Sequence, residues 1–131
     1  MAGLLTMQAI LPFPPSVNHY WRHCHTGTYI SKQGKDFRRA VRVALNAQGL
    51  AHALDGILSV KVVLCPPNRV RRDLDNFGGK ALLDALTQER DRQGRIVWPG
   101  MWVDDSQIHE LHLTWGPVIR GGQTIVTVRQ A

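Results

Sequence analysis

The stretch "GILSVKVVLCPP" (residues 56–67) predicts a β-strand, and the elements predicted on either side of it set the fold class. Its interior consists mostly of aliphatic and β-branched residues, which strands favour. Pro66 and Pro67 follow, and proline cannot donate a hydrogen bond to a neighbouring strand. We therefore expect the strand to end at these prolines.

Upstream, the pattern indicates strands and one helix. Residues 5–13, "LTMQAILPF", predict a strand that ends at the following prolines, and "TYIS" (28–31) is compatible with a short strand. Ser31 is a suitable N-cap and Gly49 a suitable stop for a helix between them. Within it, apolar residues recur at helical spacing, namely Phe37, Ala40, Val41, Ala44 and Leu45. The opposite face is basic and carries Arg38, Arg39 and Arg42.

Downstream, a second helix is expected from about Asn76 to Glu89, with a buried face formed by Leu82, Leu83, Ala85 and Leu86. Residues 88–102 predict a polar loop that contains glycine and proline. Strands are predicted at 107–115 and 123–130, joined as a hairpin through "GPVIRGG". In the 107–115 strand, we expect the same face of the sheet to carry the side chains of Leu111, Leu113 and Trp115.

The order of elements predicts an α+β fold in which two helices cover a mixed β-sheet. A chain of 131 residues fits one domain over 1–131. The apolar runs are too short to span a bilayer, and the N-terminus lacks the basic region of a signal peptide. Two cysteines make no disulfide framework, so we expect a reduced, cytoplasmic protein without a membrane anchor.

The charge of the chain is unevenly placed. The formal net charge is +6; residues 1–72 hold ten Lys/Arg and two Asp, a net of +8, whereas residues 73–131 hold six Lys/Arg and eight Asp/Glu, a net of −2. A basic chain suits a polyanionic partner, most simply nucleic acid. A generally basic surface without such a partner explains the composition equally well.

Four of the ten acidic residues stand in two short motifs. Asp73 and Asp75 lie in "RVRRDLDNFGG" (69–79), and Asp104 and Asp105 lie just before a predicted strand. Carboxylates brought together repel one another unless a cation lies between them, and their hard oxygens suit Mg²⁺ or Mn²⁺ better than zinc. Such an ion can activate water for hydrolysis of a phosphodiester bond, and a nearby arginine or lysine can hold the phosphate.

Each motif is also compatible with a structural role. A single D-x-D segment often forms ion pairs or helix caps, here with Arg69, Arg71 and Arg72 as candidate partners. Two consecutive aspartates before a strand often form a turn. The spacing alone leaves both interpretations open.

Several motifs, taken in their order, resemble the RusA-type Holliday junction resolvases. They are "RRDLDN", "KALLDALT" and "WVDDSQI", preceded by "LPFPPSVNHYW" and "YISKQGKDFRRAV". The resemblance runs from about residue 8 to residue 129. It implies a homodimeric, Mg²⁺-dependent endodeoxyribonuclease, with Mn²⁺ as a possible substitute, that resolves four-way DNA junctions by paired nicks in recombination and repair. Many members of this family are encoded by phages or prophages.

The resemblance also implies roles for particular residues. It makes Asp73, Asp75 and Asp105 the metal-binding catalytic carboxylates, Asp104 a fourth acidic contributor, and Lys80 a catalytic or phosphate-contacting residue. It places the scissile phosphate near Arg71 and Arg72 and brings the loop with Asn18 and Tyr20 to the DNA.

The chain departs from the family pattern at two places. "DNFGGK" has one extra residue before the lysine, at Gly78–Gly79. Unless the glycines absorb it in a kink, Lys80 would be rotated by about 100° on its helix. The 88–102 loop is also longer than is typical, and it could contact either DNA or the other subunit.

Other residues have two interpretations each. "HYWRHCH" (19–25) contains zinc-ligand types, but its spacing matches no standard finger, so a loop near the DNA is the preferred reading. Trp98 and Trp102 suit either base stacking or core packing. The arginines of the first helix suit either phosphate contact or a solvated face. We take Asp84 as an ion-pair or cap partner, and the two histidines of the 107–115 strand as sheet residues.

Three alternatives to a junction resolvase stay open. They are a non-catalytic protein that binds branched DNA, a nuclease that prefers flaps or forks, and a basic structural protein without a metal. Metal-dependent cutting and competition between branched substrates would separate them.

Overall fold

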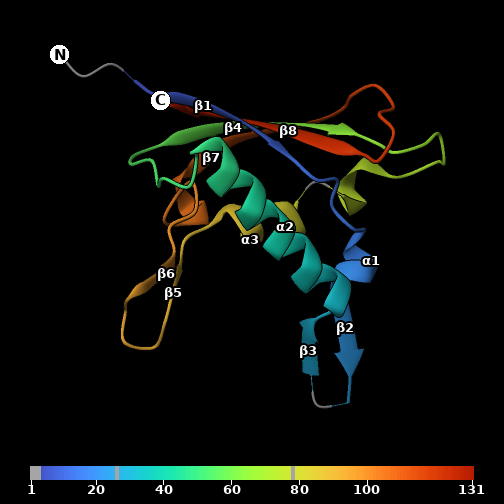
Figure 1. Ribbon diagram of the computed structural model, residues 1–131, viewed down its shortest axis with the longest axis horizontal. Helices are drawn as coiled ribbons and strands as arrows, with labels where there is room; N and C mark the ends of the chain where they lie inside the picture. Colours follow the sequence, from blue (N-terminus) through green and yellow to red (C-terminus); the bar gives the residue numbers. More distant parts are fainter. Residues whose placement is uncertain (1–3, 26, 78) are drawn as a thin grey trace.

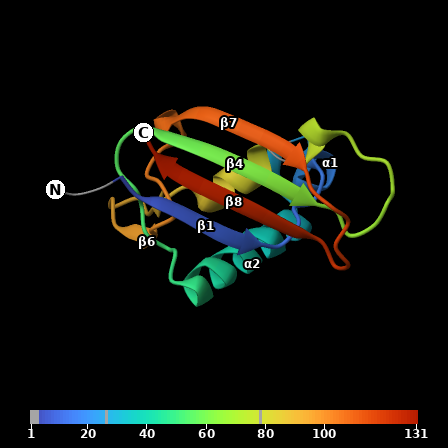
Figure 2. The ribbon, with the colours of Figure 1, turned by 90° about the horizontal axis from the view of Figure 1, so that it is seen from above.

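A four-stranded mixed sheet forms one layer of the molecule. The computed structural model describes residues 4–25, 27–77 and 79–131. The strand order is β1-β8-β4-β7, with bounds Thr6–Leu11, Gln123–Gln130, Leu58–Cys65 and Ile108–Trp115 respectively. β8 runs antiparallel to both of its neighbours, whereas β4 and β7 are parallel (Figure 2). The prediction of a mixed sheet with α+β architecture is therefore confirmed.

The predicted hairpin between β7 and β8 is wrong. β4 lies between them, and Val60 of β4 is opposite Leu111 on one side and Val128 on the other. The connection instead crosses the end of β4, where Gly116 N–H donates to the Leu64 carbonyl oxygen at 2.8 Å. The reason is long-range burial: β4 is the most apolar strand of this sheet, and a central position covers both of its edges.

The two main helices cover one face of the sheet and leave the other face open (Figures 1 and 2). α2 spans Lys32–Gln48 and has the predicted caps. The Ser31 side chain accepts a hydrogen bond from Gly34 N–H at 3.0 Å, and Gly49 ends the helix with a left-handed φ of 70°. α3 spans Lys80–Leu86, after a 3₁₀ helix, η1, at Leu74–Asn76.

α3 is shorter than predicted at both ends. Gly79 has a non-helical backbone, and Thr87 has returned to an extended conformation. The Thr87 hydroxyl lies 2.7 Å from the Leu83 carbonyl oxygen and takes part in closing the last turn. Gly78, half of the predicted kink, lies outside the described residues.

Two small hairpins extend from the helix-covered side, away from the sheet (Figure 1). The first follows a short helix, α1 at Val17–Tyr20, and consists of β2, Trp21–Cys24, and β3, Gly27–Ile30. The predicted strand at 28–31 is thus nearly confirmed, whereas the loop predicted before it forms α1 and β2. The side chains of residues 22–24, part of the zinc alternative, lie outside the description.

The second hairpin lies in a segment predicted as loop. β5 is Glu89–Arg90 and β6 is Ile96–Trp98. These strands are too short for an alternating pattern to reveal them. A second 3₁₀ helix, η2 at Asp105–Gln107, then leads directly into β7.

The core lies between the sheet and the helices. It includes Val60, Val62 and Leu64 of β4 and, from the helices, Phe37, Val41, Leu45, Leu82 and Leu86. Trp98 and Trp102 are also buried, so they pack in the core and are not available for base stacking. No helix within the described residues is long and apolar enough to cross a membrane.

β7 is an edge strand, and the face that it turns toward the helices is partly exposed. Its predicted apolar face is in register with Val60, Val62 and Leu64, but Leu111 and Trp115 remain 40% and 38% exposed. The edge position alone does not cause this exposure, because Ala9 and Leu11 of β1, the other edge strand, are buried where α2 packs against that strand.

Candidate active site

The D-x-D segment lies between the end of β4 and the start of α3. Asp73 has an extended backbone and precedes η1, and Asp75 lies within η1. Both side chains are exposed. Among the described residues, neither carboxylate forms a hydrogen bond or ion pair, so Arg69, Arg71 and Arg72 do not neutralise them. The ion-pair alternative for this segment is therefore not what the structure shows.

Arg72 stabilises the loop that leads to these aspartates. Its guanidinium donates to the Val70 carbonyl oxygen at 2.9 Å and to Asn68 Oδ1 at 2.8 Å. It also lies over the rings of Phe13 and Phe77, at 5.7 Å and 5.9 Å from their centroids. Arg72 is thus held in place by its neighbours, and its predicted contact with DNA stays a prediction.

Arg71 is placed differently. It is exposed, and no ion pair with it occurs in the part of the chain that the structure describes. It lines a surface pocket of about 410 Å³ together with Phe13, Pro14 and Phe77. Its charge is therefore available to an anion beside the D-x-D segment.

Asp105 is held at the other end of α3. Its Oδ1 atom lies 2.6 Å from the Thr87 hydroxyl and accepts from the Trp102 indole N–H at 3.0 Å. Thr87 and Trp102 are neutral, so they orient the carboxylate without cancelling its charge. Its Oδ2 atom accepts no hydrogen bond from any described residue, which leaves one oxygen open to a cation.

Asp104 serves first as a helix cap. Its Oδ1 accepts from Ser106 N–H at 2.8 Å, and this backbone hydrogen bond lowers the pKa of the Asp104 carboxyl group. Gln107 Oε1 accepts from the Asp104 N–H at 3.1 Å and completes a capping box. This cap fixes the turn that carries Asp105, and a role of Asp104 as fourth ligand stays a prediction.

Lys80 is the first residue of α3, and its side chain is exposed. Its Nζ lies 3.3 Å from Asp84 Oδ1, so the ion-pair role predicted for Asp84 is confirmed. One turn further along, Thr87 reaches Asp105. The order along α3 is therefore Lys80 at the first residue, then Asp84, and then Thr87, which contacts Asp105.

The predicted carboxylates lie at both ends of α3. A seven-residue helix is about 10 Å long, with Asp73 and Asp75 before it and Asp105 beyond it. Within residues 4–25, 27–77 and 79–131, no group of three or more His, Cys, Asp or Glu side chains is arranged to hold a metal ion. The carboxylate oxygens that accept no hydrogen bond are ligands of the kind that Mg²⁺ prefers. Among the described residues, however, three carboxylates do not lie together around one point.

The two residues predicted from the N-terminal loop have different outcomes. The side chain of Asn18 lies outside the description. Tyr20 has no exposed surface, and burial raises the pKa of its hydroxyl. Tyr20 is therefore part of the core in this structure, and its predicted contact with DNA stays a prediction.

Thr87 and Trp102 are functional candidates that sequence reasoning missed as partners of Asp105. Thr87 ends the apolar run of α3, and Trp102 stands three residues before Asp105. The sequence shows a hydroxyl at the end of this apolar run and a tryptophan shortly before the acidic pair, but neither signal reveals the contact with Asp105.

Comparison with known proteins gives a match along nearly the whole chain. The family model for endodeoxyribonuclease RusA matches residues 12–129. Crossover junction endodeoxyribonuclease RusA of Shigella sonnei is 36% identical over 126 residues, and that of Escherichia coli K12 is 35% identical over 126 residues. The protein of the same name from Enterobacteria phage 82 is 34% identical over 125 residues. Each alignment covers 95% of this chain and 95% of the relative.

Proposed function

Because this chain belongs to the RusA family of endodeoxyribonucleases, we propose that it resolves four-way DNA junctions by metal-dependent hydrolysis of phosphodiester bonds. Its relatives bear the name crossover junction endodeoxyribonuclease. The observation that carries the proposal is the family match over residues 12–129, which includes all four aspartates of the two acidic motifs.

In this proposal, Asp73, Asp75 and Asp105 hold Mg²⁺, with Asp104 as a further acidic contributor. The ion, when bound, supplies an activated water and positive charge for the phosphate. Two features of the chain support the assignment. The D-x-D carboxylates have no partner among the described residues, and Asp105 is oriented by Thr87 and Trp102 with one oxygen open.

Lys80, Arg71 and Arg72 neutralise the scissile phosphate in this proposal. The ion pair of Lys80 with Asp84 is on the surface, where such pairs contribute only about 0–1 kcal/mol, so Nζ can exchange it for a phosphate oxygen. Arg71 is exposed beside Asp73 and has no competing carboxylate among the described residues. Arg72 stabilises the loop that carries Arg71 and leads to Asp73.

The substrate and assembly follow from the same proposal. Branched DNA is a polyanion, and the chain carries a formal net charge of +6. Two cuts in opposing strands suit a homodimer with two sites related by two-fold symmetry. The cytoplasm, where such DNA is present in bacterial cells, is the proposed location.

The test uses a synthetic four-way junction with end-labelled strands. In Mg²⁺, the wild type should nick two opposing strands, and Asp75→Asn should lose this activity. Glu110→Gln is the matched control, because Glu110 is an exposed carboxylate on the open face of the sheet. No nicking by the wild type, or undiminished nicking by Asp75→Asn, would refute the proposal.

A non-catalytic protein that binds branched DNA is the second candidate. The separation of Asp105 from the D-x-D segment along α3 favours it, since no three-carboxylate group occurs among the described side chains. Junction binding without metal-dependent cutting would establish this alternative. If cutting does occur, competition among junctions, flaps and forks would show which branched substrate the nuclease prefers.

A further inference from the structure

A basic pocket lies on α2, apart from the two acidic motifs. It has a volume of about 320 Å³ and is lined by Lys35, Arg38, Arg39, Arg42 and Glu89. The four cations recur at helical spacing along one side of α2, next to the stripe of the helix that is buried in the core. Four cations face a single carboxylate, so the pocket has an excess of positive charge.

Two of the arginines are held in fixed positions at the root of the β5–β6 hairpin. Glu89 forms ion pairs with Arg42 and, at 3.7 Å, with Arg38. The guanidinium of Arg42 also lies 5.2 Å from the ring centroid of Trp98, the cross-strand neighbour of Glu89. The Trp98 indole N–H in turn donates to the Ala85 carbonyl oxygen of α3 at 3.1 Å. The basic side of α2 is thus in direct contact with the base of the β5–β6 hairpin.

The remaining charges of this surface are unneutralised. Lys35 and Arg39 are exposed, and neither forms an ion pair with any residue that the structure describes. The Nε atoms of Arg38 and Arg42 have no acceptor in the described part of the chain but are buried, so the exposed cations of Lys35 and Arg39 are the ones that a ligand can reach. An anion with several oxygens is the ligand that such a set of donors suits.

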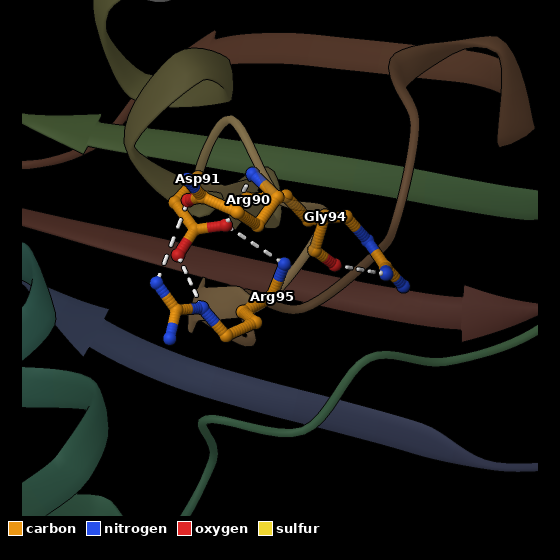
Figure 3. Close-up of polar contacts among 5 residues, drawn as sticks. Arg90, Asp91, Gly94 and Arg95 are labelled. Carbon is orange, nitrogen blue, oxygen red and sulfur yellow. Dashed lines mark hydrogen bonds and ion pairs between the residues drawn. The ribbon is translucent and has the colours of Figure 1, made fainter.

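The hairpin holds its own shape out to the tip (Figure 3). The Asp91 carboxylate accepts from Arg95 N–H at 2.9 Å and from Arg95 Nε at 2.8 Å. Arg90 donates to the Gly94 carbonyl oxygen at 2.9 Å. Arg92, at the tip, is exposed and has no ion pair among the described residues. The hairpin therefore carries Arg92, a cation without an ion-pair partner among the described residues, on a turn that is held by hydrogen bonds.

We propose that the basic face of α2 and the β5–β6 hairpin together bind the phosphodiester backbone of a duplex DNA arm, away from the bond that is cut. This inference rests on the proposed function, which makes DNA the substrate. Backbone contacts of this kind position the duplex and carry no sequence information. The surface contributes affinity and orientation, and none of its residues takes part in hydrolysis.

The experiment compares two double variants with the same loss of charge. Lys35→Gln/Arg39→Gln removes the unpaired cations of the α2 surface. Lys61→Gln/Arg129→Gln is the matched control, because these exposed residues lie on the open face of the sheet. Fluorescence anisotropy measures binding of a labelled four-way junction, and of a linear duplex equal to one arm, in EDTA at several salt concentrations.

Each lost phosphate contact reduces the slope of log K against log salt by about 0.9. The Lys35→Gln/Arg39→Gln variant should therefore lose about 1.8 from the slope and bind both DNAs roughly tenfold more weakly at physiological salt. Arg92→Gln should lose about 0.9 from the slope. The control should change affinity less than about twofold, and saturating Lys35→Gln/Arg39→Gln should nick in Mg²⁺ as fast as the wild type.

The outcomes separate this inference from the proposed function. Equal losses in both double variants, or a loss on the junction but not on the linear duplex, would overturn the arm-binding surface while leaving the nuclease intact. A wild type that neither binds nor nicks the junction would refute the proposed function, and the inference with it. Circular dichroism melting checks that each variant is folded.

Discussion

The hydroxyl of Thr87 offers the sharpest test of how Asp105 is positioned. Its Oγ1 atom lies 2.6 Å from Asp105 Oδ1 and 2.7 Å from the Leu83 carbonyl oxygen, and it accepts from Trp102 Nε1 at 2.8 Å. A hydroxyl has one proton, so it donates to only one of these acceptors at a time. The charged carboxylate is the stronger acceptor, and we expect the proton to favour Asp105.

Thr87→Val removes the hydroxyl and keeps the shape of the side chain. The lost hydrogen bond should lower the free energy of unfolding by about 1 kcal/mol, or roughly 4 °C in melting temperature for a chain of this size. Trp102 remains as one donor to Asp105, so the carboxylate is loosened but not released. Loss of a residue that orients a metal ligand typically costs about 10–100-fold in metal affinity or activity.

The assay is junction nicking as a function of Mg²⁺ concentration. For Thr87→Val we expect the concentration for half-maximal nicking to rise about tenfold, with recovery at high Mg²⁺. Thr87→Ser restores a hydroxyl and should restore the wild-type curve. An unchanged Mg²⁺ dependence, together with the expected fall in melting temperature, would show that Thr87 only stabilises the end of α3 and would refute the reasoning.

Three further predictions concern stability. Tyr20→Phe removes a buried hydroxyl that has no partner among the described residues, so urea unfolding should show equal or higher stability, by up to about 1 kcal/mol, with junction binding unchanged. Gly34→Ala would place a Cβ 2.8 Å from the Tyr20 carbonyl oxygen, and urea unfolding should show a loss of about 1–3 kcal/mol despite the better helix propensity of alanine. The lowered pKa of Asp104 means that its cap stabilises the fold above the ordinary carboxyl pKa and loses this effect as pH falls through the lower value. Stability measured from about pH 5 to pH 2 should therefore fall more steeply in the wild type than in Asp104→Asn, whose amide keeps the cap; parallel curves would contradict this.

Elements with local signals were predictable from the sequence. α2 has a polar cap at Ser31, a left-handed stop at Gly49 and apolar residues at helical spacing between them. β1 and β4 end near their prolines for an equally local reason. Each of these signals lies within a few residues of the feature that it determines.

Pairing between distant segments was not predictable in the same way. The glycines of 116–122 indicated a hairpin, but the choice of neighbour for β8 depends on burying both edges of β4. Likewise, the acidic motifs could be read from the sequence, whereas the contact of Asp105 with Thr87 joins residues 18 positions apart. The burial of Tyr20 also depends on packing across α1, α2 and α3, which the local sequence does not encode.

The position of β8 within the sheet has a consequence for synthesis of the chain. β8 is the last strand in sequence, yet it lies between β1 and β4 and pairs Thr6 with Arg129. Strands β1 and β4 therefore leave the ribosome without their shared partner and wait, with unpaired edges, until residues 123–130 have been made. Such long-range pairing slows folding and prolongs the exposure of aggregation-prone edges. A chain that stopped before residue 123 would lose the strand that joins β1 to the rest of the sheet.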